Sequence, residues 1–341
     1  MKIGVLTGGG DVPGLNQAIR GCVLQALEYG WDVIGFIDGW KGLIENLATP
    51  LSLTDVEDLM DKGGTIIGTS RTNPYKVDNG VEKVLENIKR LNIDGIVAMG
   101  GDDTLGVANR LYKEHKVKVV GVPKTMDNDL SATDYTFGFD SSVTLAVNAA
   151  EVLKDSGKSH HRIMVLEVMG RHAGWVALFT ALASGADWVL VPEEKVNLDK
   201  IYTHLRKVYQ RKKTALVIVS EGIEIPGMKV EKEELDQFGH MILKKRAVGD
   251  MVGELIEKNL NVSTRVSVIG HMQRGGSPTV FDRMLGLRTG VKAVQLIKEN
   301  KFGYMAALKG MEIIGIELEQ AVGKLKTVPQ QWIQLAMTLF K

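Results

Sequence analysis

The alternation of short apolar runs with longer amphipathic stretches constrains the fold of this chain more than any other feature. Eight runs rich in Val and Ile are almost continuously apolar, as strands buried on both faces must be. Stretches with helical periodicity separate them. This order predicts βαβ units, and therefore an α/β fold with mainly parallel sheets. We expect strands at 2–6, 32–37, 95–99, 118–122, 162–168, 188–191, 215–220 and 265–269, and helices at 14–28, 81–91, 105–115, 143–154, 173–183, 198–211, 241–258 and 280–300.

Charge and cysteine content exclude several classes of function. The 42 Lys and Arg nearly balance the 41 Asp and Glu, so neither nucleic acid nor a membrane surface is an expected partner. Cys22 is the only cysteine, which rules out an internal disulfide and a cysteine-based zinc cluster. No uncharged stretch reaches the roughly 20 residues of a membrane span, and the N-terminus lacks the pattern of a signal peptide. We therefore expect a cytoplasmic protein.

Glycine is over-represented, with 38 residues against 8 prolines in a chain of 341. Many of these glycines follow an expected strand, and ligands bind at the carboxyl ends of parallel strands. We expect them to bare the backbone for phosphate groups. At about 150 residues per domain, the length predicts roughly two domains.

The first two glycine-rich loops differ from the common nucleotide motifs. Residues 7–14 read TGGGDVPG before an expected helix, whose free N–H groups favour an anion. Pro13 stands where a dinucleotide fingerprint needs Gly, although Asp38 can mimic its ribose-binding acid. A nicotinamide-dependent oxidoreductase therefore stays an alternative. Residues 63–71 lack a P-loop lysine at Thr69 and leave Arg71 as a candidate phosphate ligand.

Two acidic motifs follow the third and fourth expected strands. In residues 99–105, Asp102 and Asp103 are candidate Mg²⁺ ligands, and Thr104 is a candidate helix cap. Residues 123–129 read PKTMDND. Two carboxylates and an amide beside a lysine are costly to bury without partners. The cluster suits proton abstraction from an alcohol together with metal and phosphate contact.

The later motifs contain candidate ligands for an anionic sugar. Arg171, His271 and Arg274 can bind an anion, and Glu221 can accept hydrogen bonds from sugar hydroxyls. His161 and His172 lack such a context, and we expect structural roles for them.

Taken in order, these motifs resemble the 6-phosphofructokinase family over nearly the whole chain. The strongest elements are Gly-Gly-Asp at 100–102, TMDND at 125–129, MGR at 169–171 and GHMQRGG at 270–276. The resemblance implies two Rossmann-like three-layer α/β domains with the active site in the cleft between them. Residues 1–139 plus about 273–323 would bind the phosphoryl donor, and residues 140–272 plus about 324–341 would bind fructose 6-phosphate. The implied reaction is the Mg²⁺-dependent transfer of a phosphoryl group to the sugar 1-hydroxyl, a step of glycolysis.

The resemblance also implies residue roles. Asp127 would be the general base, flanked by Thr125 and Asp129. Asp102 and Asp129 would hold Mg²⁺, while Arg71 and Arg171 would neutralise the transferring group. Arg162 and Arg265 would reach the sugar phosphate from a neighbouring subunit, so a homo-oligomer is expected, a tetramer rather than a dimer. The implied donor site comprises Gly9, Gly10, Arg71, Gly101, Asp102, Asp103, Thr104 and Lys124; the implied sugar site comprises Thr125, Asp127, Met169, Gly170, Arg171, Glu221, His271 and Arg274.

Two positions bear on the donor. Asp103 and Lys124 stand where ATP-dependent members carry glycine. A carboxylate at 103 adds bulk and like charge where the α-phosphate of a nucleotide would lie, so it should repel ATP. Lys124 adds a compensating cation near the donor. We predict pyrophosphate as the donor, with an ATP-dependent enzyme as the first alternative and a silent sugar-phosphate-binding regulator as a third.

Overall fold

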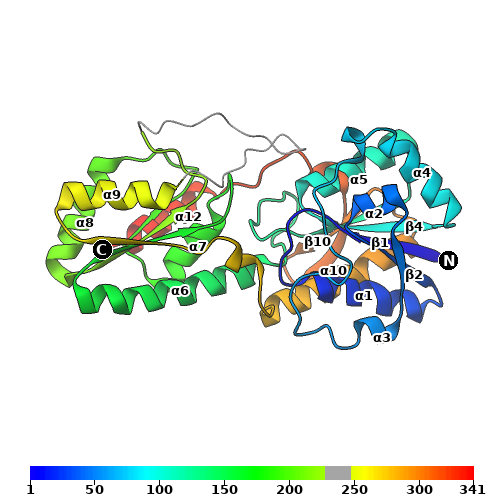
Figure 1. Ribbon diagram of the computed structural model, residues 1–341, viewed down its shortest axis with the longest axis horizontal. Coiled ribbons are helices and arrows are strands. Elements are labelled where there is room, and N and C mark those ends of the chain that lie inside the picture. The colour runs from blue at the N-terminus through cyan, green and yellow to red at the C-terminus, as the bar shows by residue number, and fades with distance from the viewer. Residues whose placement is uncertain (227–246) are drawn as a thin grey trace.

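The computed structural model describes residues 1–226 and 247–341, which form two lobes, each built around one sheet (Figure 1). The first sheet has seven strands in the order β11-β10-β5-β4-β1-β2-β3. Its central pairs are parallel, while β2–β3 and β10–β11 are antiparallel and form the two edges. The strands are β1 (Lys2–Thr7), β2 (Asp32–Phe36), β3 (Ala48–Leu51), β4 (Gly95–Gly100), β5 (Val119–Pro123), β10 (Tyr304–Lys309) and β11 (Glu312–Glu317).

Helices cover both faces of this sheet. Every residue of β4 and β5 is buried, which requires apolar cover on each side. One core cluster joins the sheet to α1 and α10, and another joins it to α2, α4 and α5. The helices of this lobe are α1 (Leu15–Glu28), α2 (Trp40–Glu45), α3 (Leu53–Val56), α4 (Gly80–Arg90), α5 (Asp102–His115), α10 (Val280–Lys298) and α11 (Leu318–Ala321), with a 3₁₀ turn at η1 (Pro74–Lys76).

The second lobe is smaller and entirely parallel within its sheet. Its four strands run in the order β7-β8-β6-β9, and β8 is buried at every residue. The strands are β6 (Ile163–Val168), β7 (Trp188–Leu190), β8 (Ala215–Ser220) and β9 (Thr264–Val268). The helices are α6 (Phe139–His160), α7 (Trp175–Ser184), α8 (Leu198–Lys212), α9 (Val248–Leu260) and α12 (Gln330–Leu339), with a 3₁₀ turn at η3 (Gly270–Arg274).

The predicted fold class is confirmed, and all eight expected strands are present. Each lies within two residues of its predicted bounds. Three strands were missed, namely β3, β10 and β11, and all three lie at or next to an antiparallel edge. The helix expected at 143–154 spans 139–160 instead. Of the helix expected at 241–258, residues 241–246 lie outside the described chain, and α9 accounts for most of the rest.

The chain passes between the lobes more than once. After β9 it returns to the first sheet through η3 and α10, adds β10 and β11, and ends with α12 packed against α7 in the second lobe. The exact division into two domains stays a prediction. In the described residues, no helix is long and apolar enough to cross a membrane.

Candidate active site

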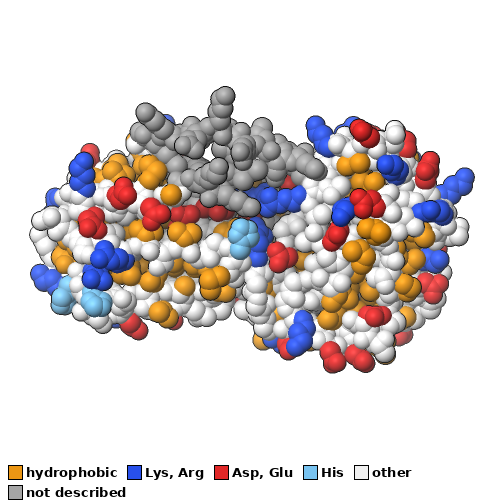
Figure 2. Space-filling model, in the orientation of Figure 1, with side chains coloured by type: hydrophobic (Ala, Val, Ile, Leu, Met, Phe, Trp, Pro, Cys, Tyr) orange, Lys and Arg blue, Asp and Glu red, His pale blue; other side chains and the backbone are white. Residues whose placement is uncertain are grey.

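A cavity of about 330 Å³ brings together loops from both lobes. Lys and Arg side chains gather where the lobes meet (Figure 2). The first sheet contributes loops that follow β1, β4 and β5, and the second contributes the loop that follows β6. The lining residues are Gly9, Gly10, Val12, Arg71, Gly101, Asp102, Asp103, Thr104, Lys124, Thr125, Asp127, Asp129, Arg171, His172, Arg274, Gly323, Lys324 and Leu325.

Most of the predicted site residues therefore share one cavity, including the whole implied donor site. The remaining predicted residues do not line it. These are Met169, Gly170, Glu221, His271, Arg162 and Arg265.

The glycines of the β1 loop leave space that other side chains of the protein occupy, as well as space for a ligand. A Cβ at Gly10 would lie 2.4 Å from Arg274 Nη1, so the glycine admits that guanidinium. A Cβ at Gly8 would lie 2.5 Å from Thr104 Oγ1. Gly9 lines the cavity with a left-handed φ of 81°, and a Cβ there would lie 3.4 Å from Lys124 Nζ. The expectation that these glycines expose the backbone to phosphate stays a prediction, and at Gly8 and Gly10 the missing Cβ also makes room for protein atoms.

The start of α5 places two carboxylates in its first turn, where the helix dipole favours negative charge. Asp102 Oδ1 accepts a hydrogen bond of 2.7 Å from the Gly323 N–H. Thr104 was predicted to cap this helix, and that prediction is wrong. The cap position is Gly101, with no side-chain hydrogen bond, and Thr104 is buried inside the first turn.

Lys124 follows β5 and is buried. Its Nζ donates a 2.6 Å hydrogen bond to the Gly10 carbonyl, which ties the β5 loop to the β1 loop. Burial, with the nearby Arg274 guanidinium, lowers the pKa of Lys124 to about 7, and the Asp127 carboxylate opposes that shift. The lysine is thus a cation whose charge depends on anions in the cavity.

Asp127 is 5% exposed and faces the cavity. Its backbone N–H donates to Thr125 Oγ1 at 3.1 Å, and its Oδ1 is buried without a hydrogen-bond partner among the described residues. A buried oxygen without a partner is costly unless a ligand satisfies it. Burial and the Asp127 charge raise the pKa of the adjacent Asp129 carboxyl.

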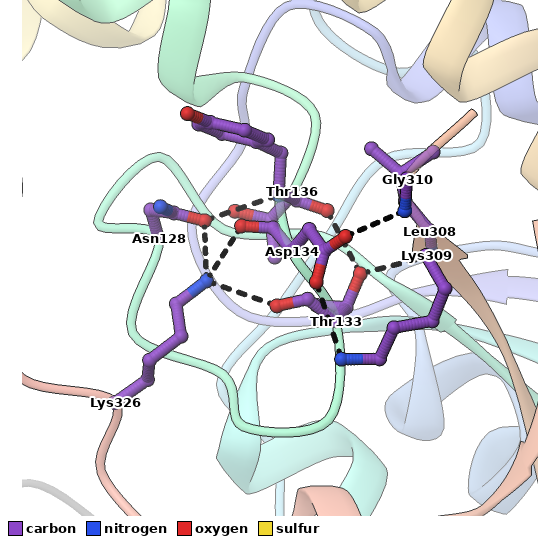
Figure 3. A network of polar contacts seen from close by, with 9 residues as sticks. Asn128, Thr133, Asp134, Thr136, Leu308, Lys309, Gly310 and Lys326 are labelled. Atoms are coloured by element: carbon purple, nitrogen blue, oxygen red, sulfur yellow. Dashed lines mark hydrogen bonds and ion pairs between the residues drawn. The ribbon is translucent and has the colours of Figure 1, made fainter.

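Asn128 separates these two carboxylates and is not among the lining residues. Its φ is 50°, in the left-handed region. Its side-chain oxygen accepts hydrogen bonds from the Thr136 N–H at 3.2 Å and from Lys326 Nζ at 2.9 Å (Figure 3). The turn is therefore fixed by contacts outside the cavity, while Asp127 and Asp129 line the cavity.

In the second lobe, Glu221 supports the loop that follows β6. Its Oε1 accepts hydrogen bonds from the N–H groups of Gly170 (3.3 Å) and Arg171 (3.2 Å). Burial raises the pKa of this carboxyl, as does the negative charge of Asp127. Met169 N–H donates to Gln273 Oε1 at 2.8 Å. Glu221 thus orients the turn that carries Arg171; its predicted contact with sugar hydroxyls stays a prediction.

Arg162 and Arg265 lie at the amino ends of β6 and β9, which run parallel. The loops that reach the cavity leave the opposite, carboxyl end of this sheet. Arg265 is exposed, as is His271 in η3. The structure therefore does not bring these two arginines to the cavity of their own chain.

Sequence reasoning missed several lining residues. His172 was expected to be structural but lines the cavity. Gly323, Lys324 and Leu325 come from the stretch AVGKLKTVP at 321–329, which has no recognisable motif. Conversely, Asp38 does not line the cavity; it forms an ion pair with Lys41 at 3.7 Å, which leaves the nicotinamide alternative without its acid.

The cavity can accept Mg²⁺ only together with other ligands. Within residues 1–226 and 247–341, no group of three or more His, Cys, Asp or Glu can hold a metal alone. Asp102 and Asp129 nevertheless line the same cavity. Mg²⁺ is usually bound by one or two carboxylates, with phosphate oxygens and water completing its shell. The residues therefore fit an ion shared with a phosphorylated substrate.

The comparisons with known proteins agree with one another. Residues 2–297 match the family model described as phosphofructokinase. The pyrophosphate–fructose 6-phosphate 1-phosphotransferase of Dictyoglomus thermophilum is 48% identical over 100% of this chain and 99% of its own. The ATP-dependent 6-phosphofructokinase of Mycobacterium leprae is 42% identical over 100% of each chain. A crystal structure of the pyrophosphate-dependent phosphofructokinase from Nitrosospira multiformis superposes with a TM-score of 0.85 at 21% identity, covering 96% of this chain and 86% of that one.

Proposed function

The chain belongs to the phosphofructokinase family, and from that membership we propose that it transfers a phosphoryl group from pyrophosphate to the 1-hydroxyl of fructose 6-phosphate. The products are fructose 1,6-bisphosphate and phosphate. The observation that carries the choice of donor is the pair Asp103 and Lys124 on one cavity wall. This enzyme serves glycolysis and acts in the cytoplasm.

Asp127 is the group that starts the reaction. Its buried Oδ1, which has no partner among the described residues, accepts the proton of the sugar 1-hydroxyl. The hydroxyl oxygen attacks the phosphorus of the phosphoryl group at the same time. Thr125 Oγ1, bonded to the Asp127 N–H, holds the turn. Such a base must lie within hydrogen-bond reach of the hydroxyl, which the orientation of Asp127 into the cavity permits.

Cationic side chains neutralise the charge that spreads over the transferring group. Arg71 comes from the first lobe and Arg171 from the second, so they approach the cavity from different sides. Lys124 and the backbone at Gly9 and Gly10 hold the pyrophosphate. Electrostatic stabilisation of this kind is commonly the largest contribution to phosphoryl transfer.

Asp102 and Asp129 are the residues that would hold Mg²⁺. When bound, Mg²⁺ would offset the negative charge of the phosphoryl donor. Asp102 keeps one oxygen on the Gly323 N–H and has the other for the ion. Burial and the Asp127 charge raise the pKa of Asp129 to about 6, and a cation held nearby would lower it again.

The sugar phosphate needs a second subunit. Arg162 and Arg265 lie at the amino ends of β6 and β9, opposite the end that faces the cavity. We therefore assign them to the cavity of a neighbouring copy. Met169, Gly170, Glu221, His271 and Arg274 form the sugar side within one chain. The functional unit is then a homo-oligomer, with a tetramer favoured, and each chain divides into residues 1–139 plus about 273–323 and residues 140–272 plus about 324–341.

Parallel assays with pyrophosphate and with ATP test the donor. We expect turnover with pyrophosphate and fructose 6-phosphate in the presence of Mg²⁺, in both directions, and little with ATP. An ATP-dependent enzyme is the second candidate because relatives of that kind are also more than 40% identical. Turnover with ATP alone would select it and overturn the donor proposal.

A further inference from the structure

Residues 323–328, here called the crossing segment, contact both lobes. At one end the Gly323 N–H donates to Asp102 Oδ1 at 2.7 Å. At the other end the Val328 N–H donates to Glu193 Oε1 at 2.9 Å. The Glu193 carboxylate also accepts from the Gly174 N–H, immediately before α7 and close in sequence to Arg171. The segment therefore joins the start of α5 to the start of α7.

Lys326 lies in the middle of this segment and uses all three of its donors. Its Nζ donates to Asn128 Oδ1 at 2.9 Å, to the Thr133 carbonyl at 3.1 Å and to the Asp134 carbonyl at 3.0 Å (Figure 3). An ammonium group has three N–H donors, so this half-buried cation is fully satisfied.

The backbone of Lys326 adds two further contacts. Its N–H donates to the Asp129 carbonyl at 2.8 Å. Its carbonyl accepts from Trp175 Nε1 at 2.7 Å, and Trp175 opens α7 in the second lobe. One residue thus contacts the turn that carries the acids and the helix that follows Arg171.

Asn128 links the contacts of Lys326 to the two carboxylates of the active site, Asp127 and Asp129. It adopts a left-handed φ between Asp127 and Asp129, a conformation that asparagine tolerates better than most residues. Lys326 Nζ and the Thr136 N–H hold its side-chain oxygen. A rotation at this residue would redirect both neighbouring carboxylates.

We propose that Lys326 is a positioning residue for the turn at 125–129: by holding Asn128 it keeps Asp127 and Asp129 directed into the cavity, and by its bond to Trp175 it couples that turn to the second lobe. The expected effect of Lys326 on the reaction rate rests on the proposed function. Its expected effect on the conformation of the turn at 125–129 does not.

The first test compares Lys326→Met with Lys326→Arg and with Lys309→Met. Lys309 forms a surface ion pair with Asp134 at 3.2 Å in the same network but does not contact Asn128, so it is a matched control. We expect Lys326→Met to lower kcat about 10- to 100-fold, because misplacing reacting groups by about 1 Å has effects of that size. KM for fructose 6-phosphate should change far less. Lys326→Arg should recover much of kcat, and Lys309→Met should stay within about two-fold of the parent.

A double-mutant cycle with Asn128→Ala tests the route. If Lys326 acts through Asn128, the Lys326→Met change should cost little in the Asn128→Ala background. Independent, multiplicative losses would overturn the proposal. So would a folded Lys326→Met enzyme with unchanged kcat.

Hydrogen exchange separates this proposal from the proposed function. In Lys326→Met, the Thr136 amide should exchange on the order of ten-fold faster, because its acceptor Asn128 is no longer fixed. Lys309→Met should leave it unchanged. Unchanged exchange in Lys326→Met would overturn the positioning role. If the parent protein turned over neither pyrophosphate nor ATP, the proposed function would fail, and exchange at Thr136 would still decide the role of Lys326.

Discussion

The two walls of the cavity differ in how much of their site one chain provides. The wall from the seven-stranded sheet gathers the β1, β4 and β5 loops into one cavity, and internal bonds such as Lys124 Nζ to the Gly10 carbonyl fix it. The wall from the four-stranded sheet is open, with His271 exposed and Arg162 and Arg265 at the far end of their strands. Under the proposed function, the donor side would be complete in one chain, whereas the sugar side would require another copy.

The largest expected effect lies on the complete wall. Asp127→Asn keeps the shape of the side chain but removes the base, and we expect kcat to fall by about 10²- to 10⁴-fold. KM should change much less, because the rest of the cavity is preserved. Steady-state kinetics with pyrophosphate measures both. The assignment of Asp127 as the base would be falsified if turnover stayed within a few-fold of the parent enzyme.

Substitutions in the wall from the four-stranded sheet should mainly raise KM for fructose 6-phosphate. Arg162→Ala removes a charged hydrogen bond to the sugar phosphate worth about 1.5–3 kcal/mol, so KM for fructose 6-phosphate should rise about 10- to 100-fold. The same holds for Arg265→Ala. An unchanged KM would remove both arginines from the sugar site.

Mixing variants distinguishes a shared site from a self-contained one. Chains carrying Asp127→Asn and chains carrying Arg162→Ala, reassembled together, should regain about a quarter of the parent activity at low sugar phosphate, because half of the paired interfaces are mixed and each of those has one intact site. A mixture of Asp127→Asn with Arg171→Ala is the matched control. These two residues line the cavity of one chain, so no activity should return. Equal recovery in both mixtures would refute the difference between the walls.

A smaller effect is expected at Asp103, to which we assign the choice of donor. Asp103→Gly removes the like charge and bulk facing a nucleotide, and we expect ATP-dependent turnover to rise roughly ten-fold. Asp103→Asn is the control that keeps the bulk and removes the charge, so the pair separates sterics from electrostatics. A folded Asp103→Gly enzyme with no gain in ATP turnover would contradict this explanation of donor choice.

The two walls were also predictable to different degrees. The donor wall consists of loops that directly follow strands, and short apolar runs such as residues 95–99 locate those strands well. Because parallel strands end at one edge, the motifs after β1, β4 and β5 had to converge. The sequence could not reveal which glycines meet protein atoms, because the partner of Gly10 is Arg274, far away in the chain.

Elements and residues that depend on tertiary contacts could not be recognised from the local sequence pattern. Strand β3 is four residues long and contains Pro50, and β11 pairs antiparallel at an edge, so neither has the pattern of a buried strand. Lys326 and Gly323 stand in a stretch of mixed polar and apolar residues, and only the folded chain brings them to Asn128 and Asp102. Nothing in residue type or spacing distinguishes Lys326 from the neighbouring Lys324.

The junction between the walls contains a buried acid, Asp282, in the first turn of α10. Its Oδ2 accepts hydrogen bonds from the Ser141 N–H (2.8 Å) and Oγ (2.6 Å) at the start of α6. Burial raises the pKa of this carboxyl from 3.8 to about 7, against the opposing effect of the Ser141 bonds. Between these two pH values the folded state holds a proton that the unfolded state has released. The contribution of Asp282 to stability is thus complete below about pH 4 and is lost as pH rises through 7.

Asp282→Asn should therefore stabilise the protein more at pH 8 than at pH 5. The amide oxygen still accepts from Ser141, while the cost of burying a charge disappears. We expect a gain on the order of 1–3 kcal/mol at pH 8, measured by denaturant unfolding at the two pH values. Asp140→Asn is the control, because its carboxylate accepts from Thr279 Oγ1 (2.6 Å) at the same junction. An equal effect of Asp282→Asn at both pH values would show that the buried carboxyl does not titrate on folding, and the junction would then be no more sensitive to pH than either wall.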